Sequence, residues 1–199
     1  MEEKKYFIVM ETKKQVKKTR EKREDTKQED IMILIVNTTA DKSVSEALRE
    51  ELKNSAVEAE IVEASEMKIS HCIGCNYCWL KTPGECSIKD DYEVILKKMI
   101  HAKQLWVISD TALGFLDHKG KNIFDRILPV ATMYLKFVGD QMRHVARYKD
   151  KFDIGLIYKG DPDVEYLKRW NERATLNFES KSLGVFSTSE IKEAVSCMH

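Results

Sequence analysis

Residues 31–45 have the sequence IMILIVNTTADKSVS, and this pattern is the starting point for predicting the fold. Six apolar residues, most of them β-branched, are followed by a polar loop rich in hydroxyl side chains, after which apolar residues recur at helical spacing. A continuous apolar run of this length is typical of a strand in the middle of a parallel sheet, where both faces are covered. The stretch therefore predicts a strand, a loop and a helix, which is the repeating unit of an α/β protein.

The alternation of strands and helices continues through the rest of the chain. Further strands are predicted at 58–64, 104–109, 152–158 and 183–186. Helices are predicted at about 44–52, at 92–100 after a cap formed by Asp90 and Asp91, at about 123–133 with a bend at Pro129, at 164–178 and from Ser189. We therefore expect an α/β protein with a doubly wound, five-stranded parallel sheet in the order 2-1-3-4-5 and helices on both faces.

In that arrangement a ligand binds at the carboxyl ends of the strands, beside the switch point between the first and third strands. The loop after the first strand offers hydroxyl groups just before a helix N-terminus, where free backbone N–H groups favour a phosphate. These hydroxyl groups belong to Thr38, Thr39, Ser43 and Ser45. The loop lacks the glycines of a dinucleotide fingerprint and the Gly-Lys-Ser/Thr of a P-loop, so a monophosphate suits it better. The alternative is a turn that only caps its helix.

The loop after the third strand, residues 109–122, offers backbone polar groups beside apolar side chains. Its candidate contacts are Ser109, Thr111, Ala112, Leu113 and Gly114. A planar heteroaromatic ring could lie against this surface, and Gly114 permits a close approach or a positive φ. The alternative is a strand end whose apolar side chains pack into the core.

The most specific motif of the chain lies at 71–91, HCIGCNYCWLKTPGECSIKDD. It places Cys72, Cys75, Cys78 and Cys86 in a C-x2-C-x2-C-x7-C pattern, so that four deprotonated thiols can converge on one soft metal centre. Zinc sites more often use two separated C-x2-C pairs, whereas three cysteines in close succession are typical of iron–sulfur loops. We therefore predict an iron–sulfur cluster ahead of zinc, and the alternative is a set of reduced thiols that bind no metal.

The composition of the 199-residue chain, with 43% apolar and 33% charged residues, is that of one globular domain. No apolar run approaches the ~20 residues of a membrane helix. The formal net charge of zero gives no field that would gather nucleic acid or an anionic membrane. Without an export signal, we expect a cytoplasmic protein whose cysteines are metal ligands or redox groups.

Residues 1–30 differ in composition from the rest of the chain, because they contain ten basic and eight acidic residues around one short apolar island. We interpret them as a charged N-terminal extension that precedes a domain at 31–199. Their basic stretch is compatible with an RNA-binding arm. A solvated helix or tail is the favoured interpretation, because no aromatic residues are interleaved for stacking on bases.

Residues 72–109 run from CIGCNYC through the helix start IKDD to the strand QLWVIS. They resemble the iron–sulfur flavoprotein and NAD(P)H-dependent FMN reductase branch of the flavodoxin-like superfamily. The resemblance continues through the flavin-ring loop to Asp125 and Arg126 and covers about 31–188. It implies a flavodoxin-like fold, FMN at the two loops, a cluster of the [4Fe-4S] type on the four cysteines, NAD(P)H as electron donor, and a homo-oligomer, either a dimer or a tetramer.

The chain also departs from that family in both flavin loops. It has Asn37-Thr38-Thr39-Ala40 where the family has Gly-Ser-Pro-Arg, and Asp110 stands in the ring loop. Three functions stay open. The leading hypothesis is an FMN-dependent oxidoreductase that passes electrons between NAD(P)H or a reduced protein and a small-molecule or protein partner, with no residue nominated as a general base. The alternatives are a cluster-free NAD(P)H:quinone or flavin reductase and a non-enzymatic partner subunit that has lost FMN.

Overall fold

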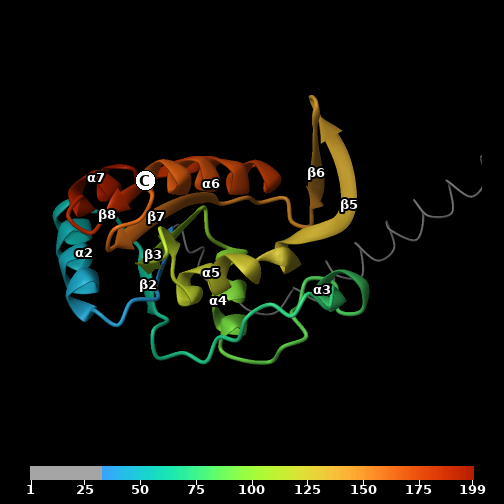
Figure 1. The fold of residues 1–199 in the computed structure, drawn as a ribbon, viewed down its shortest axis with the longest axis horizontal. Helices are drawn as coiled ribbons and strands as arrows, with labels where there is room; N and C mark the ends of the chain where they lie inside the picture. The colour runs from blue at the N-terminus through green and yellow to red at the C-terminus, as the bar shows by residue number, and fades with distance from the viewer. Residues whose placement is uncertain (1–32) are drawn as a thin grey trace, which may run out of the picture. The chain divides into compact units, whose positions relative to one another are not determined.

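The computed structural model describes residues 33–199, which belong to one compact unit, Ile31–His199 (Figure 1). The predicted extension at 1–30 lies outside the described residues. The strands are β1 (Ile33–Asn37), β2 (Glu60–Glu63), β3 (Gln104–Ala112), β4 (Phe115–Leu116), β5 (Ala131–Val138), β6 (Gln141–Ala146), β7 (Asp153–Lys159) and β8 (Ser182–Ser187). The helices are α2 (Lys42–Asn54), α3 (Tyr77–Leu80), α4 (Tyr92–Met99), α5 (His118–Asp125), the 3-10 helix η1 (Leu128–Val130), α6 (Val164–Asn177) and α7 (Ile191–Ser196).

The central sheet is parallel and has the strand order β2-β1-β3-β7-β8. Counted in chain order along these five strands, this is the predicted order 2-1-3-4-5, which is therefore confirmed. Val36 of β1 pairs with Val62 on one side and with Val107 of β3 on the other, and all five residues of β1 are buried. The short strand β4 pairs antiparallel with the end of β3.

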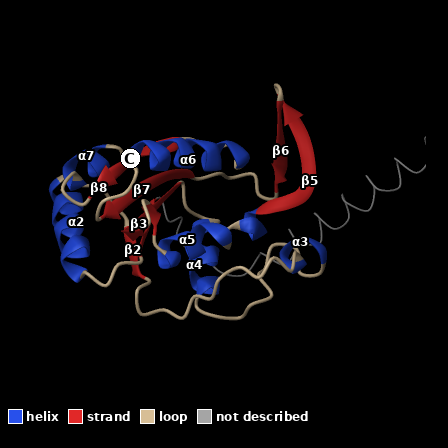
Figure 2. Ribbon diagram, viewed as in Figure 1, coloured by secondary structure: helices blue, strands red, loops and turns tan. Residues whose placement is uncertain are grey.

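Helices cover both faces of this sheet, as predicted (Figure 2). Alternate residues of β1 belong to two separate apolar clusters: Ile35 packs in one cluster with residues of α2 and α7, and Leu34 packs in the other with residues of α4, α5 and α6. Because successive side chains of a strand point to opposite faces, these two clusters are the two interfaces between sheet and helices. Within 33–199, no helix is both long and apolar enough to cross a membrane.

The prediction of an α-helix at 123–133 is wrong. α5 begins at His118 and ends at Asp125, and five residues separate it from the strand β5, which starts at Ala131. Pro129 lies in η1, where its missing N–H and fixed φ prevent an α-helix from continuing. The chain then enters the hairpin formed by β5 and β6, a two-stranded sheet that was not predicted.

The loop predicted at 110–122 is shorter than expected. β3 continues to Ala112 and reverses into β4 through a two-residue turn at Leu113 and Gly114, whose φ values are +52° and +78°. α5 then starts directly after Asp117, whose side chain accepts a hydrogen bond from the backbone N–H of Gly120. The third strand therefore ends in a tight hairpin and a capped helix, with little free loop between them.

Candidate functional site

The four clustered cysteines line one small pocket. The segment that carries them is bent by two residues in the left-handed region, Gly74 with φ +66° and Asn76 with φ +57°. Asn76 directly precedes α3, the single helical turn that contains Cys78. Cys78 is buried, and the cysteines before and after it are half-buried. The structure therefore brings together the thiols that the sequence motif predicted as ligands.

The thiols of this pocket differ in acidity. The hydroxyl of Ser87, which lies 3.2 Å from the Sγ of Cys75, and the backbone N–H of Tyr77 lower the pKa of Cys75. Burial, and then the neighbouring thiols, raise the pKa of Cys78 to about 11. Cys78 is therefore protonated at neutral pH, and a metal that binds there must displace its proton.

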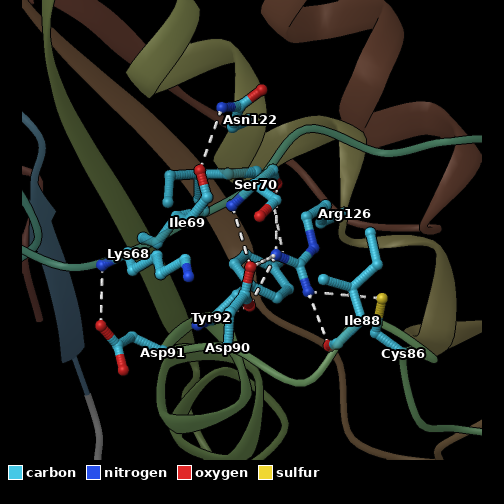
Figure 3. Close-up of polar contacts among 11 residues, drawn as sticks. Lys68, Ile69, Ser70, Cys86, Ile88, Asp90, Asp91, Tyr92, Asn122 and Arg126 are labelled. Atoms are coloured by element: carbon cyan, nitrogen blue, oxygen red, sulfur yellow. Dashed lines mark hydrogen bonds and ion pairs between the residues drawn. The ribbon is translucent and has the colours of Figure 1, made fainter.

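Arg126 lines the pocket and forms a buried ion pair with Asp90 (Figure 3). The side chain of Arg126 is 1% exposed, and its Nη1 lies 2.6 and 2.7 Å from the two carboxylate oxygens of Asp90. Its Nη2 donates to the Sγ of Cys86 at 3.4 Å and to the carbonyl of Ile88 at 3.2 Å. The guanidinium also lies over the ring of Tyr92, 4.6 Å from its centroid. A cation is therefore fixed in direct contact with one of the four candidate ligands.

The acidic pair before α4 does more than cap a helix. Asp90 accepts from the backbone N–H of Tyr92 at 3.2 Å and of Ser70 at 2.9 Å, and Asp91 accepts from the N–H of Lys68 at 2.7 Å. Burial acts to raise the pKa of Asp90, but the hydrogen bonds from Arg126 and Ser70 outweigh it, so the pKa lies below its usual value. The two carboxylates tie the chain before the first cysteine to the start of α4.

The donor set of the pocket fits an iron–sulfur cluster in its chemistry. Four thiols are ligands for a soft metal centre, and the guanidinium of Arg126 contacts the Sγ of Cys86 at 3.4 Å. Among residues 33–199, no group of three His, Cys, Asp or Glu side chains is placed to hold a single metal ion.

In the predicted phosphate loop, the hydroxyl groups are turned inward. Thr38 and Thr39 are 1% exposed, and their hydroxyls donate to the carbonyl of Ile108 at 2.8 Å and to the side-chain oxygen of Asn37 at 2.9 Å. The buried Ser45 accepts from the amide of Asn37 at 2.8 Å. The hydroxyl of Ser43 donates to the carboxylate of Asp41 at 2.6 Å, so all four predicted phosphate contacts are already engaged within the protein.

The sequence interpretation missed Asp41, which caps α2. Its carboxylate accepts from the backbone N–H and the hydroxyl of Ser43, at 3.0 and 2.6 Å, and pairs with Lys159 at the end of β7. The hydrogen bond from Lys159, followed by those from Ser43, lowers the pKa of Asp41 to about 2. Lys42, the first residue of α2, does not pair with Asp41 but with the exposed Glu66. An Asp two residues before a Ser at the start of an apolar helix is the signal for this cap.

The predicted contacts of the ring loop are divided between buried and exposed positions. Ser109 is fully buried, with its hydroxyl 2.7 Å from the carbonyl of Asp110 and 3.1 Å from the carboxylate of Asp117. Thr111 donates to the carbonyl of Lys159 at 3.2 Å. Leu113, the first residue of the turn, is completely exposed. The last three predicted contacts, Ala112, Leu113 and Gly114, form the strand end and the turn and are available to a ligand.

The ends of β1, β3 and β7 meet at one edge of the sheet. Thr38 donates its backbone N–H to Ile108 of β3, and Lys159 of β7 reaches Asp41 in the loop after β1. The cysteine segment does not share this position, because α3 lies on the opposite side of the view from the start of α2 (Figure 1). Within one chain, the cysteine pocket and the predicted phosphate loop are therefore separate sites.

Comparison with known proteins gives related sequences for part of the chain. No family model matches. An iron–sulfur flavoprotein of Archaeoglobus fulgidus is 38% identical over 81 residues, which is 41% of this chain and 39% of that protein. An iron–sulfur flavoprotein of Methanocaldococcus jannaschii is 33% identical over 101 residues, which is 51% of this chain and 48% of that protein. The matches span less than half the length of these relatives.

Solved structures extend the comparison to most of the chain. An NAD(P)H:quinone oxidoreductase from Methanothermobacter marburgensis is 12% identical with a TM-score of 0.54, over 85% of this chain and 96% of that one. A putative quinone reductase from Klebsiella pneumoniae is 13% identical with a TM-score of 0.53, over 84% and 81% of the two chains. At these identities the likeness concerns the fold. The chain has a flavodoxin-like fold, and part of its sequence is similar to iron–sulfur flavoproteins.

Proposed function

We propose that this chain is a flavodoxin-like oxidoreductase that carries electrons on an iron–sulfur cluster bound by Cys72, Cys75, Cys78 and Cys86 and on FMN bound at the carboxyl edge of the sheet. The observation that supports this most strongly is the convergence of the four cysteines on one pocket beside a buried arginine. Chains named iron–sulfur flavoproteins are similar to this one over part of its length.

The cysteine pocket supplies ligands, charge compensation and shielding from water. The four thiols would hold the cluster and lose their protons as it binds, and a bound cluster supplies one-electron transfer. Arg126 offsets part of the thiolate charge, because its Nη2 contacts Cys86. Asp90 in turn fixes Arg126. The protein therefore contributes a rigid, half-buried frame that orients the ligands.

The proposed flavin site contains hydrogen-bond donors suited to an anion, and the carboxylate of Asp41 occupies them. The carboxylate of Asp41 lies at the N-terminus of α2 and accepts from Ser43 and Lys159, so it stands in for a phosphate in a donor set suited to an anion. We propose that the FMN phosphate takes these donors when Asp41 turns away, and that the isoalloxazine ring lies against the turn at Ala112–Gly114. Bound FMN supplies hydride and single-electron chemistry.

We further propose that NAD(P)H is the electron donor, that the acceptor is a small molecule or a protein, and that the protein works in a reducing cytoplasm. One solved neighbour is named an NAD(P)H:quinone oxidoreductase. All five cysteines are free thiols, a state that a reducing compartment maintains.

The chain is also proposed to form a homo-oligomer through the β5–β6 hairpin. Two-stranded hairpins are marginally stable by themselves, and this one exposes several large apolar side chains. These are Met133, Tyr134, Leu135, Phe137, Val138 and Met142. Their burial against a second copy would stabilise both the hairpin and the assembly.

The experiment that tests the proposed function is anaerobic purification of the full chain, followed by quantification of iron, acid-labile sulfide and FMN per chain. Iron, sulfide and FMN together are the expected result. Iron and sulfide without FMN would refute the flavin half of the proposal, and FMN alone would refute the cluster half and favour a thiol-containing reductase. An absence of all three would refute the whole proposal.

A non-enzymatic subunit without FMN is the second candidate function. It is favoured by the inward hydroxyls of Thr38 and Thr39 and by the carboxylate of Asp41, which repels a phosphate unless it moves. Titration of the purified chain with FMN, followed by quenching of flavin fluorescence, separates the two. Saturable binding supports the oxidoreductase, and an absence of binding supports the subunit.

A further inference from the structure

Arg126 is among the largest fully buried side chains of the described residues, although it carries a charge. It follows α5 directly, so it lies where the negative end of the helix dipole favours a cation. Burying a guanidinium is costly unless its charge and its donors are matched. Asp90 neutralises the charge at 2.6 Å, and it is held in place by the backbone N–H groups of Ser70 and Tyr92.

The donors of Arg126 are directed at the cysteine segment. Nη1 also contacts the carbonyl of Ser70 at 3.2 Å, just before the first cysteine, and Nη2 contacts the Sγ of Cys86 and the carbonyl of Ile88 (Figure 3). Nε is buried and has no partner among the described residues. Arg126 also lines the pocket that the four cysteines share. One side chain thus connects both ends of the segment and keeps one donor unused.

We propose that Arg126 is a positioning residue for the iron–sulfur cluster, which holds Cys86 in ligating position through Nη2 and raises the reduction potential of the cluster. This inference rests on the proposed function. Reduction of a bound cluster adds one negative charge, and a fixed cation in contact with a ligand sulfur stabilises the reduced form more than the oxidised form. Hydrogen bonds to cluster sulfurs act in the same direction.

The electron balance of this step is simple. The oxidised cluster takes up one electron, supplied by dithionite in the experiment below, and no bond to Arg126 forms or breaks. Arg126 stays protonated in both states, because the guanidinium does not release its proton in proteins. Asp90 keeps the pair neutral, so the effect of Arg126 depends on its direct contact with the Sγ of Cys86 rather than on net charge.

The experiment measures iron and sulfide content and the reduction potential, by a dithionite titration followed by electron paramagnetic resonance, in the anaerobically purified full chain. The variants are Arg126→Gln, Arg126→Lys and the double variant Asp90→Asn with Arg126→Gln, which removes both charges of the pair without leaving an unpaired carboxylate. Arg49→Gln is the control, because Arg49 is an exposed residue of α2 that pairs with Glu63. Circular dichroism verifies that each variant is folded.

We expect Arg126→Gln to lower the equilibrium constant for reduction by roughly tenfold, which corresponds to about 59 mV for one electron. The double variant should also lower the reduction potential, but by less. Arg126→Lys should give a potential between those of the wild type and Arg126→Gln, and Arg49→Gln should leave the potential unchanged. Loss of the cluster from folded Arg126→Gln with retention in Arg126→Lys also supports the positioning role.

Two outcomes would overturn the proposal. The first is a full cluster with an unchanged potential in the double variant. The second is equal loss of the cluster from the Lys and Gln variants, which would make Arg126 a packing element only. A wild-type chain that is folded but contains no iron or sulfide refutes the proposed function itself, and that result is separate from either outcome.

Discussion

The cysteine segment and the phosphate loop both present side chains with binding chemistry, but they leave those side chains in different states. In the phosphate loop the hydroxyls of Thr38 and Thr39 donate to Ile108 and Asn37. In the cysteine pocket, Arg126 and Asp90 bond to the chain on both sides of the cysteines, and all four cysteines line the pocket. The first region forms hydrogen bonds among its own polar groups, and the second places four thiols along one pocket.

The difference has a physical reason. A hydroxyl is a strong donor that must be paired when it is buried, and the nearest partner in a tight loop is the backbone or a neighbouring side chain. A thiol is a weak donor that loses little when it is left unpaired, so burial does not divert it from a metal. Hydroxyl-rich loops are therefore a weaker indication of a ligand than clustered cysteines.

The largest expected effect concerns the cysteine side of this comparison. Cys75→Ala should remove most of the iron and sulfide, because it deletes a ligand at a half-buried position without opening the core. Cys197→Ala is the matched control, because this thiol packs near α7 and outside the pocket. Metal analysis and the visible spectrum check both variants. Equal iron content in the two would contradict the assignment of ligands.

The next effect concerns the phosphate side. Asp41→Asn keeps a capping side chain on α2 but removes the charge that competes with a phosphate, so FMN should bind roughly tenfold tighter. Lys159→Ala should weaken binding by a similar factor, because it removes the cation at this position. The control is Asp140→Asn in the hairpin turn, and isothermal titration with FMN is the measurement. Unchanged affinity in both test variants would place the phosphate elsewhere.

A smaller effect is expected at the hairpin, which is connected to the cysteine segment. The indole N–H of Trp79 in α3 donates to the carbonyl of Leu128, and its ring lies 5.0 Å from that of His144 in β6. If the hairpin mediates self-association, Phe137→Ser should weaken it by a factor of roughly five to thirty, because this side chain is 74% exposed in the single chain.

Light scattering over a dilution series measures that change. Val94→Ser is the control, because Val94 is also an exposed apolar residue but lies on α4. An unchanged mass profile for Phe137→Ser, at concentrations where the wild type dissociates, would exclude the hairpin as the interface.

The smallest expected effect is on the stability of the fold in acid. It concerns Asp41, in the loop before α2, and Glu179, which pairs with Lys136 of the hairpin. Asp41 and Glu179 have pKa values lowered to about 2, the first chiefly by Lys159 and the second by Lys136 and Lys151. Because these pKa values are lower in the folded state, the stabilisation is present above about pH 4.5 and is lost as the pH falls toward 2.

Glu179→Gln should therefore reduce the free energy of unfolding by about 1 kcal/mol at pH 7 and by much less at pH 2. Urea unfolding at a series of pH values measures this difference. An equal loss at both pH values would show that the ion pairs of Glu179 do not cause the effect.

The fold was predictable from local pattern to a large extent. The five parallel strands and their order follow from apolar runs such as IMILIV and from the alternation with helices. The hairpin was missed because no element was predicted between the helix at 123–133 and the strand that starts at 152. Only Pro129 indicated that the helix could not continue.

The candidate ligands of the site could be predicted from the sequence, but the residues that contact and position them could not. The motif at 72–86 identified the cysteines by spacing, since ligand spacing is a local property. Arg126 lies forty positions after Cys86, and its contact with that sulfur exists only because α5 packs against the cysteine segment. Similarly, the pairing of Asp41 with Lys159 joins residues 118 positions apart.

The sequence by itself determined the five parallel strands, their order in the sheet and the four thiols, because periodicity and spacing act over a few residues. Tertiary structure decided which hydroxyls form hydrogen bonds within the protein, which carboxylate lies at the start of α2 and which cation contacts the Sγ of Cys86. These depend on contacts between distant segments. Such contacts are fixed by packing, through the burial and pairing that it imposes on each polar group.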